Sequence, residues 1–357
     1  MKRLGIALAC IAVLAAAGWF ALRSPSVEAR LFREIAFRAV AKPAPRLADA
    51  KELSVLLCGT GSPLPDKARG GPCTLIAAGD RLYLVDAGID SARNLLLWRV
   101  PLQKIAGVLI THFHSDHIGE LGEIRLQSWV AGRTAPLAVY GPPGVEQVVA
   151  GFNQAYALDA GYRTAHHGAA MLPPAAVAMI AHTVTIASGA TATVLDDGGL
   201  KITAIRVHHD PATPAYGYRF DYAGRSIVVS GDTAPDEDLA RAAKGADILV
   251  HEGLSPEMVA IMRDALAAAG HTRQAKIFHH IPGYHTSPVD AARIANEAGA
   301  RLLVFTHIIP MLPNSFAERL FLRGVADIRS DGVKLGHDGL VLRLPGGGTA
   351  IEEDDLN

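Results

Sequence analysis

The stretch HFHSDH, residues 112–117, decides the fold of this chain. It follows an apolar run over residues 105–111 that is typical of a buried strand, so its polar side chains come at a strand end. Three imidazoles and one carboxylate within six residues form a nitrogen and oxygen donor set that suits Zn²⁺. Positions 112, 114, 116 and 117 do not share one face of a helix. The pattern therefore predicts a tight loop that turns these side chains towards a common point.

The composition fits a large folded domain and argues against a nucleic-acid-binding protein. Half of the 357 residues are hydrophobic, which is ample for a core. The formal net charge is −1, so no global positive field would collect nucleic acid, although a local basic patch is compatible with this value. Nucleic acid is therefore the less favoured partner at this stage.

The N-terminus has the pattern of an export segment. Lys2 and Arg3 precede an uncharged run over residues 4–22, which resembles a signal-peptide core and is just long enough to span a bilayer. Small residues at 15–17 offer a cleavage site, but the apolar run continues beyond it, so an uncleaved anchor is equally compatible. We expect residues 1–25 to be a signal peptide or a membrane anchor, and the main domain to be periplasmic or attached to the membrane.

Three further segments follow along the chain. Residues 26–52 hold a short amphipathic helix and a Pro-containing linker, 53–345 form the globular domain, and 346–357 are an acidic tail. Within the globular domain, one group of strands and helices lies before roughly residue 190, and a second such group lies after it. This arrangement predicts an α/β fold of two sheet-plus-helix halves packed face to face.

The expected elements follow from apolar periodicity and turn residues. Strands are expected at 53–58, 74–77, 81–85, 105–111, 137–140, 200–207, 215–222, 225–229, 248–251 and 302–306. Helices are expected at 26–40, 91–99, 121–130, 145–157, 236–243, 256–269 and from Ser287 to Gly299. Residues 158–174 show no clear periodicity, which leaves a substrate wall, a lid or a solvated loop open, and a His-rich loop follows residue 269.

The cysteines and one aspartate add two local expectations. Three cysteines are too few for a zinc site or a disulfide framework. Cys58 and Cys73 lie in or beside two early strands, where a disulfide in an oxidising compartment is one alternative and isolated buried thiols are the favoured one. Asp86 follows the strand at 81–85, where it is either a turn former or, as we favour, the group that orients a ligating histidine beneath the metal site.

Three later stretches complete a recognisable set with HFHSDH. They are His208-His209, Ser230-Gly231-Asp232-Thr233, and Thr306-His307-Ile308-Ile309-Pro310 after the apolar strand at 302–306. In this order they resemble the metallo-β-lactamase superfamily of binuclear hydrolases. The resemblance covers residues 53–344 and implies an αββα sandwich with the active site at the seam between the two sheets.

The resemblance also implies a ligand set for two metal ions, expected to be Zn²⁺ with Mn or Fe as alternatives. One ion would be held by His112, His114 and one histidine of the 208–209 pair. We favour His209, because the family pattern places its histidine five residues before a proline, here Pro214. The second ion would be held by Asp116, His117 and His307, and Asp232 would bridge both ions.

The resemblance further implies the chemistry. The two ions would share a bridging hydroxide that attacks the scissile centre, with Asp116 and Asp232 orienting it. His285 in Tyr-His-Thr-Ser and Glu252 in His-Glu-Gly resemble paired motifs of the ribonuclease Z branch. There, such a histidine meets the leaving group and the acidic residue orients it.

The substrate class depends on finer features. Residues 140–144, 214–233 and 284–288 resemble ribonuclease Z and its relatives, the alkaline arylsulfatases of this fold and related phosphodiesterases. Typical tRNA-processing members carry a Gly-Pro-rich arm before the Gly-Asp-Thr strand, whereas residues 222–225 here are a tight hairpin. Together with the neutral charge and the export segment, this favours a small anionic ester, an aryl sulfate or a phosphodiester, as the substrate.

The sequence leaves three alternatives open. They are a ribonuclease Z-type tRNA 3′-processing endonuclease, a lactonase or other carboxylic-ester hydrolase, and a non-catalytic metal-binding protein that keeps the fold. The oligomeric state is left open, with a homodimer as one alternative.

Overall fold

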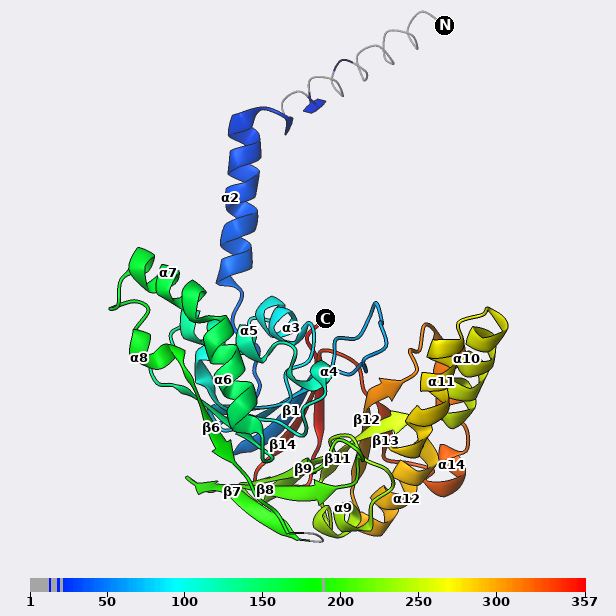
Figure 1. The fold of residues 1–357 in the computed structure, drawn as a ribbon. Coiled ribbons are helices and arrows are strands. Elements are labelled where there is room, and N and C mark those ends of the chain that lie inside the picture. Colours follow the sequence, from blue (N-terminus) through cyan, green and yellow to red (C-terminus); the bar gives the residue numbers. More distant parts are fainter. Residues whose placement is uncertain (1–12, 14–17, 20–21, 188–189) are drawn as a thin grey trace, which may run out of the picture. The chain divides into compact units, whose positions relative to one another are not determined.

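A computed structural model describes residues 13, 18–19, 22–187 and 190–357 (Figure 1). The chain divides into two compact units, residues 1–44 and 45–357. The first contains α2 (Pro25–Ala41), which agrees with the amphipathic helix expected at 26–40 and has no buried residue. Most of the predicted signal or anchor segment, residues 1–25, lies outside the described residues. No helix within the described part of the chain has the length and apolar character needed to cross a membrane.

The second unit is built on two β-sheets. The eight-stranded sheet has the order β15-β14-β1-β2-β3-β4-β5-β6, and the seven-stranded sheet has the order β13-β12-β11-β10-β9-β8-β7. The first sheet consists of β1 (Glu52–Gly59), β2 (Cys73–Ala78), β3 (Arg81–Val85), β4 (Ile105–Leu109), β5 (Leu137–Gly141), β6 (Met179–Thr183), β14 (Leu340–Pro345) and β15 (Glu352–Asp355). The second consists of β7 (Thr191–Asp197), β8 (Leu200–Val207), β9 (Ala215–Tyr222), β10 (Arg225–Val229), β11 (Ile248–Leu254), β12 (Leu302–Ile309) and β13 (Val333–Leu335).

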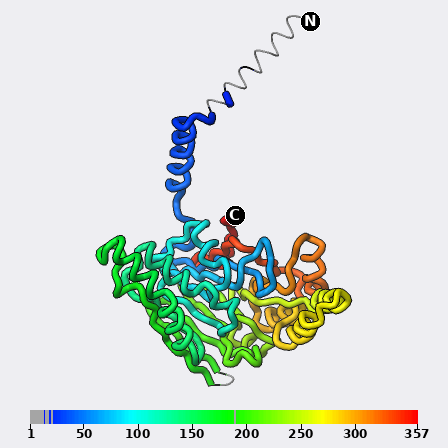
Figure 2. The backbone as a smooth tube through the Cα atoms, turned by 45° about the horizontal axis from the view of Figure 1, so that its top comes forward, coloured from blue at the N-terminus to red at the C-terminus, as the bar shows by residue number. Residues whose placement is uncertain are grey.

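Helices cover the outer face of each sheet (Figure 1). Those that accompany the first sheet are α3 (Ser91–Leu97), α4 (Ser115–Ile118), α5 (Leu121–Val130), α6 (Val145–Ala155), α7 (Ala157–His167) and α8 (Pro174–Val177). Those that accompany the second are α9 (Glu237–Ala242), α10 (Pro256–Ala268), α11 (Thr272–His280), α12 (Pro288–Ala298), α13 (Ser315–Phe321) and α14 (Val325–Ile328). Figure 2 shows the C-terminal strands, in red, beside the N-terminal blue strands, as the pairing of β14 with β1 requires.

The alternation of side chains along the strands explains the four layers. Val55 and Leu57 of β1 point into the core between the sheets, where they join residues such as Phe220 of the opposite sheet. Leu56 points the other way, into the core beneath helices such as α5. Because successive strand side chains alternate between faces, a strand buried on both sides is apolar throughout. The mixed α/β layered architecture predicted from the sequence is confirmed.

Several local expectations are wrong. The segment 158–174, expected to be irregular, begins with the helix α7, which buries only Ala160 and so leaves no apolar stripe in the sequence. The His-rich stretch after residue 269 forms the helix α11 rather than a loop, since Ala275 and Phe278 anchor it one turn apart. The acidic C-terminal segment contributes β15 to the sheet edge.

The expectation of isolated thiols is also wrong. Cys58 and Cys73 form a disulfide with their Cα atoms 5.0 Å apart. The strands β1 and β2 are antiparallel neighbours, and their register places Cys73 opposite Gly59, one residue from Cys58. Strand register brings the two sulfur atoms together, and spacing along the chain does not reveal it.

Candidate metal centre

The candidate site lies where strands of both sheets end. Within the first sheet β3, β4 and β5 run parallel, and within the second β10, β11 and β12 do. The segment after β4 carries the HFHSDH residues and that after β10 carries Asp232, while β11 and β12 supply Glu252 and His307 near their own ends. Parallel strands present their carboxyl ends at the same edge, so polar residues from distant parts of the chain meet there.

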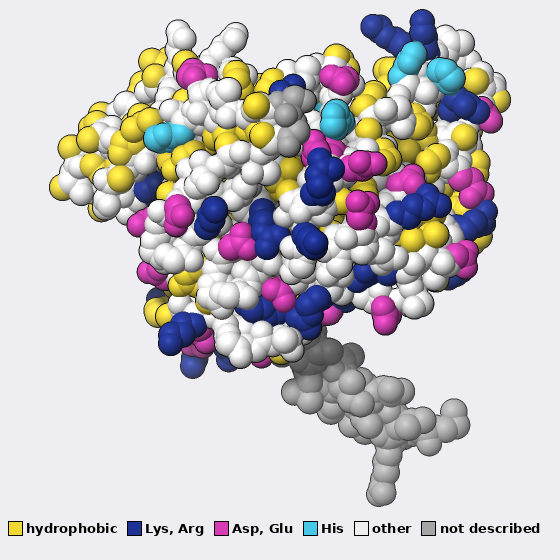
Figure 3. Space-filling view, turned by 90° about the horizontal axis from the view of Figure 1, so that it is seen from below, with side chains coloured by type: hydrophobic (Ala, Val, Ile, Leu, Met, Phe, Trp, Pro, Cys, Tyr) yellow, Lys and Arg dark blue, Asp and Glu magenta, His cyan; other side chains and the backbone are white. Residues whose placement is uncertain are grey.

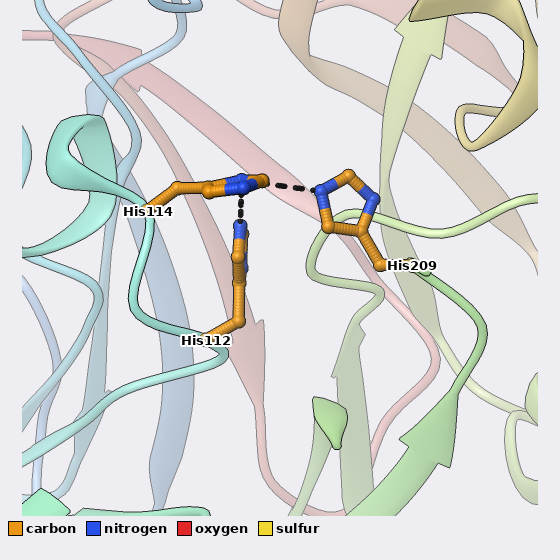
Figure 4. A group of neighbouring side chains, drawn as sticks. All are labelled: His112, His114 and His209. Atoms are coloured by element: carbon orange, nitrogen blue, oxygen red, sulfur yellow. Dashed lines mark hydrogen bonds between the residues drawn. The ribbon is translucent and has the colours of Figure 1, made fainter. Parts of the chain in front are cut away.

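Three histidines converge on one point (Figure 4). His112 Nε2 lies 2.8 Å from His114 Nδ1, which lies 3.3 Å from His209 Nε2. His209 Nδ1 faces the carbonyl of Tyr284 at 2.9 Å, and because a carbonyl only accepts, Nδ1 carries the proton and Nε2 keeps its lone pair. Burial holds the pKa of His112 well below its ordinary value and lowers that of His209 to about 4. Neutral imidazoles with inward lone pairs are the form that binds a cation.

The neighbouring residue His208 has a different environment. Its Nδ1 lies 2.6 Å from Asp236 Oδ2, and 64% of its side chain is exposed. Of the 208–209 pair, it is therefore His209 that faces the site.

A second donor group adjoins the first. It consists of Asp116, His117 and His307, whose ligand atoms lie within 4.8 Å of one another. Asp116 Oδ2 lies 3.5 Å from His117 Nε2 and 3.4 Å from His307 Nε2. His117 Nε2 is buried and has no hydrogen-bond partner among the described residues. A buried nitrogen without a partner is costly unless a cation occupies the space that it faces.

Asp232 lies between the two groups. Its Oδ2 is 3.2 Å from His307 Nε2 and 3.3 Å from His117 Nε2, and 3.8 Å from His209 Nε2 on the other side. Although burial alone would raise its pKa, His307 and His117 hold the pKa of Asp232 well below its ordinary range. The central carboxylate is therefore negatively charged, and the chemistry of the donor set fits divalent cations.

Asp86 supports this arrangement from beneath, as expected from the sequence. Its Oδ2 lies 2.7 Å from His117 Nδ1, and its Oδ1 accepts from the Thr111 N–H at 2.8 Å. Asp86 adopts a left-handed backbone conformation, with φ of 60°, at the end of β3. Since the carboxylate accepts from Nδ1–H, the ring of His117 is fixed with Nε2 towards the metal position.

His285 and Glu252 form the pair that the sequence suggested. His285 Nδ1 lies 2.9 Å from Glu252 Oε1, which also accepts from the backbone N–H groups of Thr233 and Thr286 at 3.1 and 3.2 Å. Burial lowers the pKa of His285, and burial together with Asp232 raises the pKa of Glu252 well above its ordinary value. His285 stacks on His307 with ring centroids 5.5 Å apart, so it stands beside the second donor group.

A cleft of about 320 Å³ opens onto these groups. Its polar side includes Asp116, His285 and His307, and its apolar side includes Leu64, Ile277, Phe278, Ile281, Tyr284 and Ile309. The sequence-based predictions do not include this apolar wall. Tyr284 directly precedes His285 in Tyr-His-Thr-Ser, and this adjacency could have identified it.

Comparison with known proteins gives consistent findings. The sequence profile of the family described as Beta-lactamase superfamily domain matches residues 81–308. The chain is 37% identical over 263 residues to the ribonuclease Z of Mycobacterium bovis (strain BCG / Pasteur 1173P2), covering 73% of this chain and 87% of that protein. The ribonuclease Z of Mycobacterium avium (strain 104) is equally similar, with 37% identity and the same coverage.

Solved structures show the same fold. The metallo-beta-lactamase fold protein YhfI from Bacillus subtilis superposes with a TM-score of 0.59 at 21% identity, over 82% of this chain and 100% of that chain. The short form of human tRNase Z superposes with a TM-score of 0.58 at 20% identity, over 81% of this chain and 98% of that chain.

Proposed function

We propose that this chain, which belongs to the ribonuclease Z family of the beta-lactamase superfamily, is an endonuclease that cleaves precursor tRNA on its 3′ side. As a member of that family it is a metal-dependent hydrolase that acts on phosphodiester bonds. The observation that carries the proposal is that members of both metal-donor groups line one cleft together with His285, whose ring Glu252 holds.

The preference for an aryl sulfate or another small anionic ester is wrong. Curated relatives with 37% identity over most of their length are ribonucleases Z, and they favour the tRNA alternative. The short turn between β9 and β10 was correctly expected, since β9 ends at Tyr222 and β10 begins at Arg225. The missing arm and the net charge of −1 do not show that the whole surface lacks a site for RNA.

The donor geometry supports two ions, for which we propose zinc. His112, His114 and His209 would hold one, and Asp116, His117 and His307 would hold the other, with Asp232 between them. When bound, two divalent cations supply Lewis acidity, which activates water and offsets the negative charge of a phosphodiester.

The chain's own residues supply the remaining steps. Asp232 and Asp116 are buried carboxylates that orient the attacking water and limit the net positive charge of the site. His285 receives its orientation from Glu252, because its Nδ1–H points at Oε1 and leaves Nε2 for the cleft. In its doubly protonated form, His285 donates the Nε2 proton to the leaving ribose oxygen, which as an alkoxide would be a poor leaving group.

The test is a cleavage assay with the purified chain loaded with zinc. Precursor tRNA labelled at its 5′ end is incubated with the wild type and with Asp232→Ala, and the products are sized on a gel. We expect a single cut at the 3′ side of the tRNA by the wild type and none by the variant. The same wild-type sample is also tested on bis(p-nitrophenyl) phosphate. If it hydrolyses this ester but leaves precursor tRNA intact, the proposed substrate is overturned and the phosphodiesterase chemistry is retained.

We also propose that the N-terminal segment brings the domain to or across a membrane. Support comes from Lys2 and Arg3 before the apolar run at 4–22, and from the Cys58–Cys73 disulfide, which is typical of oxidising compartments. Location determines which RNA the enzyme meets, whereas the site determines which bond it cuts. Cell fractionation with and without residues 1–25 tests the location separately, and a wild type found only in the soluble cytosolic fraction would contradict it.

A further inference from the structure

The α10–α11 hairpin forms one wall of the metal cleft. Its two helices are joined at Gly270, which has φ of +81°, and pack on each other through Val259 and Phe278. The same cluster contains Leu254 of β11 and Ile309 of β12, so the hairpin is fixed to the strands that carry the site. Ile277 and Phe278 of α11 line the cleft together with Asp116, Asp232 and His307.

One face of α11 is positively charged. Positions 273, 276, 277 and 280 are three, four and seven residues apart, so they form one stripe on the helix. Arg273, Lys276 and His280 of this stripe are exposed. Ile277, in the same stripe, is 53% exposed and lines the cleft, which places the charged side chains beside its mouth.

The charge of this stripe is not neutralised within the protein. By contrast, Arg263 of α10 pairs with Asp264, and Arg323 pairs with Glu257 of α10. Arg273 and Lys276 form no ion pair with any described residue, and α11 contains no Asp or Glu. Figure 3 shows Lys, Arg and His side chains gathered at its upper right, whereas basic and acidic side chains alternate over the middle of that face.

Next to the stripe, the cleft wall offers a flat apolar surface. Tyr284 is half-buried, with its ring 4.9 Å from the ring of His285, and its hydroxyl has no hydrogen bond to the described residues. Ile281 lies between Tyr284 and α11 in sequence and lines the same cleft. An aromatic ring beside apolar side chains is a surface on which a nucleobase stacks.

We propose that α11 is the element that binds the RNA backbone, with Arg273 and Lys276 on phosphates and a base stacked on Tyr284. This inference rests on the proposed function and identifies where an enzyme without the Gly-Pro-rich arm holds its polynucleotide. Ile277 of the stripe lines the same cleft as His114, Asp116 and His307, so a strand that passes over α11 would lead a phosphodiester towards His285. Phosphate contacts of this kind supply affinity without sequence preference.

The test compares two double variants of the full chain. Arg273→Ala/Lys276→Ala removes the stripe, and Arg93→Ala/Lys201→Ala removes the same charge, likewise from exposed residues, from α3 and β8, elements that Figure 1 places away from α11. Cleavage of precursor tRNA is measured at several KCl concentrations between about 50 and 200 mM. Zinc content and thermal melting confirm that both variants are folded.

We expect the stripe variant to raise KM for precursor tRNA about tenfold or more with little change in kcat. The slope of log KM against log salt should fall by about 1.4 to 1.8, because each lost phosphate contact contributes about 0.7 to 0.9. The control should keep the wild-type KM and slope. Equal KM values and slopes in the two variants would overturn the proposal.

A wild type that does not cut precursor tRNA would count against the proposed function alone. The stripe is then tested by fluorescence anisotropy with a labelled single-stranded oligonucleotide. Weaker binding by the stripe variant than by the control supports the inference, and equal binding overturns it. Tyr284→Ala should weaken binding in the same assay, whereas Tyr284→Phe, which keeps the ring, should bind like the wild type.

Discussion

Asp86→Asn should weaken metal binding although Asp86 is not expected to be a metal ligand. The carboxylate of Asp86 accepts three hydrogen bonds, from the Thr111 N–H at 2.8 Å, the Thr111 hydroxyl at 2.9 Å and His117 Nδ1 at 2.7 Å. An asparagine side chain has one accepting oxygen and one donating NH₂ group. It therefore cannot satisfy the backbone of Thr111 and the ring of His117 at the same time.

Both orientations of the new amide are unfavourable. If its oxygen faces His117, the NH₂ group meets the Thr111 N–H, donor against donor, in a buried position. If its NH₂ group faces His117, Nδ1 must accept, and the proton moves to Nε2, which points at Asp232 and Asp116. A protonated Nε2 cannot bind a cation. Loss of such an orienting partner weakens metal affinity about 10- to 100-fold, or about 1.4 to 2.7 kcal/mol.

The assay is a zinc titration against a chromophoric chelator, which resolves the tighter and the weaker ion. The ion held by Asp116, His117 and His307 should bind more weakly in Asp86→Asn, while the ion of the three-histidine group is less affected. Asp80→Asn is the matched control, since it makes the same change on the exposed turn between β2 and β3. An Asp86→Asn protein that binds both ions with wild-type affinity would refute the reasoning.

Three further variants test other parts of the molecule. Asp247→Ala should destabilise the fold by about 3 kcal/mol in urea unfolding at neutral pH, because it leaves the buried Arg225, 2.9 Å from Asp247 Oδ1, without its partner. Burial alone would raise the pKa of Asp247, but the bonds from Arg225 and Arg301 keep this pKa below its ordinary value. The stabilisation by Asp247 is therefore present above about pH 4 and is lost as the pH falls through the lower pKa of the folded state. A stability difference between wild type and variant that grows in acid would contradict the assignment. Arg125→Met should leave thermal stability unchanged or raise it by about 1 kcal/mol, because Nε and Nη1 of this buried side chain have no hydrogen-bond partner among the described residues; a large loss would mean that the charge is compensated. His285→Ala should keep its zinc, measured by elemental analysis, yet lower kcat on RNA about 100-fold or more while sparing bis(p-nitrophenyl) phosphate, whose leaving group needs no proton; equal loss on both substrates would remove the acid role.

Elements with strong local signals could be predicted from the sequence. The strand at 200–207 and the helix at 121–130 have the predicted bounds. The helix α12 begins with Ser287 accepting from the Asp290 N–H at 3.1 Å and ends at Gly299 with φ of 62°, as a serine cap and a C-terminal glycine require. In these elements a periodic apolar pattern or a capping residue decides the local conformation.

Elements whose structure depends on distant partners could not be predicted. The helix α7 buries a single alanine, and β7 is a largely exposed edge strand, so neither leaves a continuous apolar pattern. The disulfide depends on the register between β1 and β2, which no local pattern encodes.

The candidate site was the most predictable part of the molecule. Its seven metal-donor candidates come from four separate loops and strand ends, and all of them meet at one place. This prediction is possible because each donor lies at or after the end of a buried strand. The carboxyl ends of the parallel strands in the two sheets lie at one common edge. The cleft wall was missed, since Phe278 and Tyr284 are ordinary core-type residues until the fold places them beside the donors.

The error about the substrate has a physical cause in how charge is distributed. Net charge sums all ionisable groups, but a polyanion responds to cations that have no carboxylate nearby. In this chain many arginines are paired, such as Arg323 with Glu257, and therefore contribute little field at the surface. Arg273 and Lys276 form no ion pair with a described residue and lie on a helix for which the sequence predicts a His-rich loop, so the sequence does not reveal that they share one face with Ile277 of the cleft wall. A neutral chain can hold RNA if unpaired cations lie beside the reacting phosphate, and the salt slope of the stripe variant measures how many phosphate contacts Arg273 and Lys276 make.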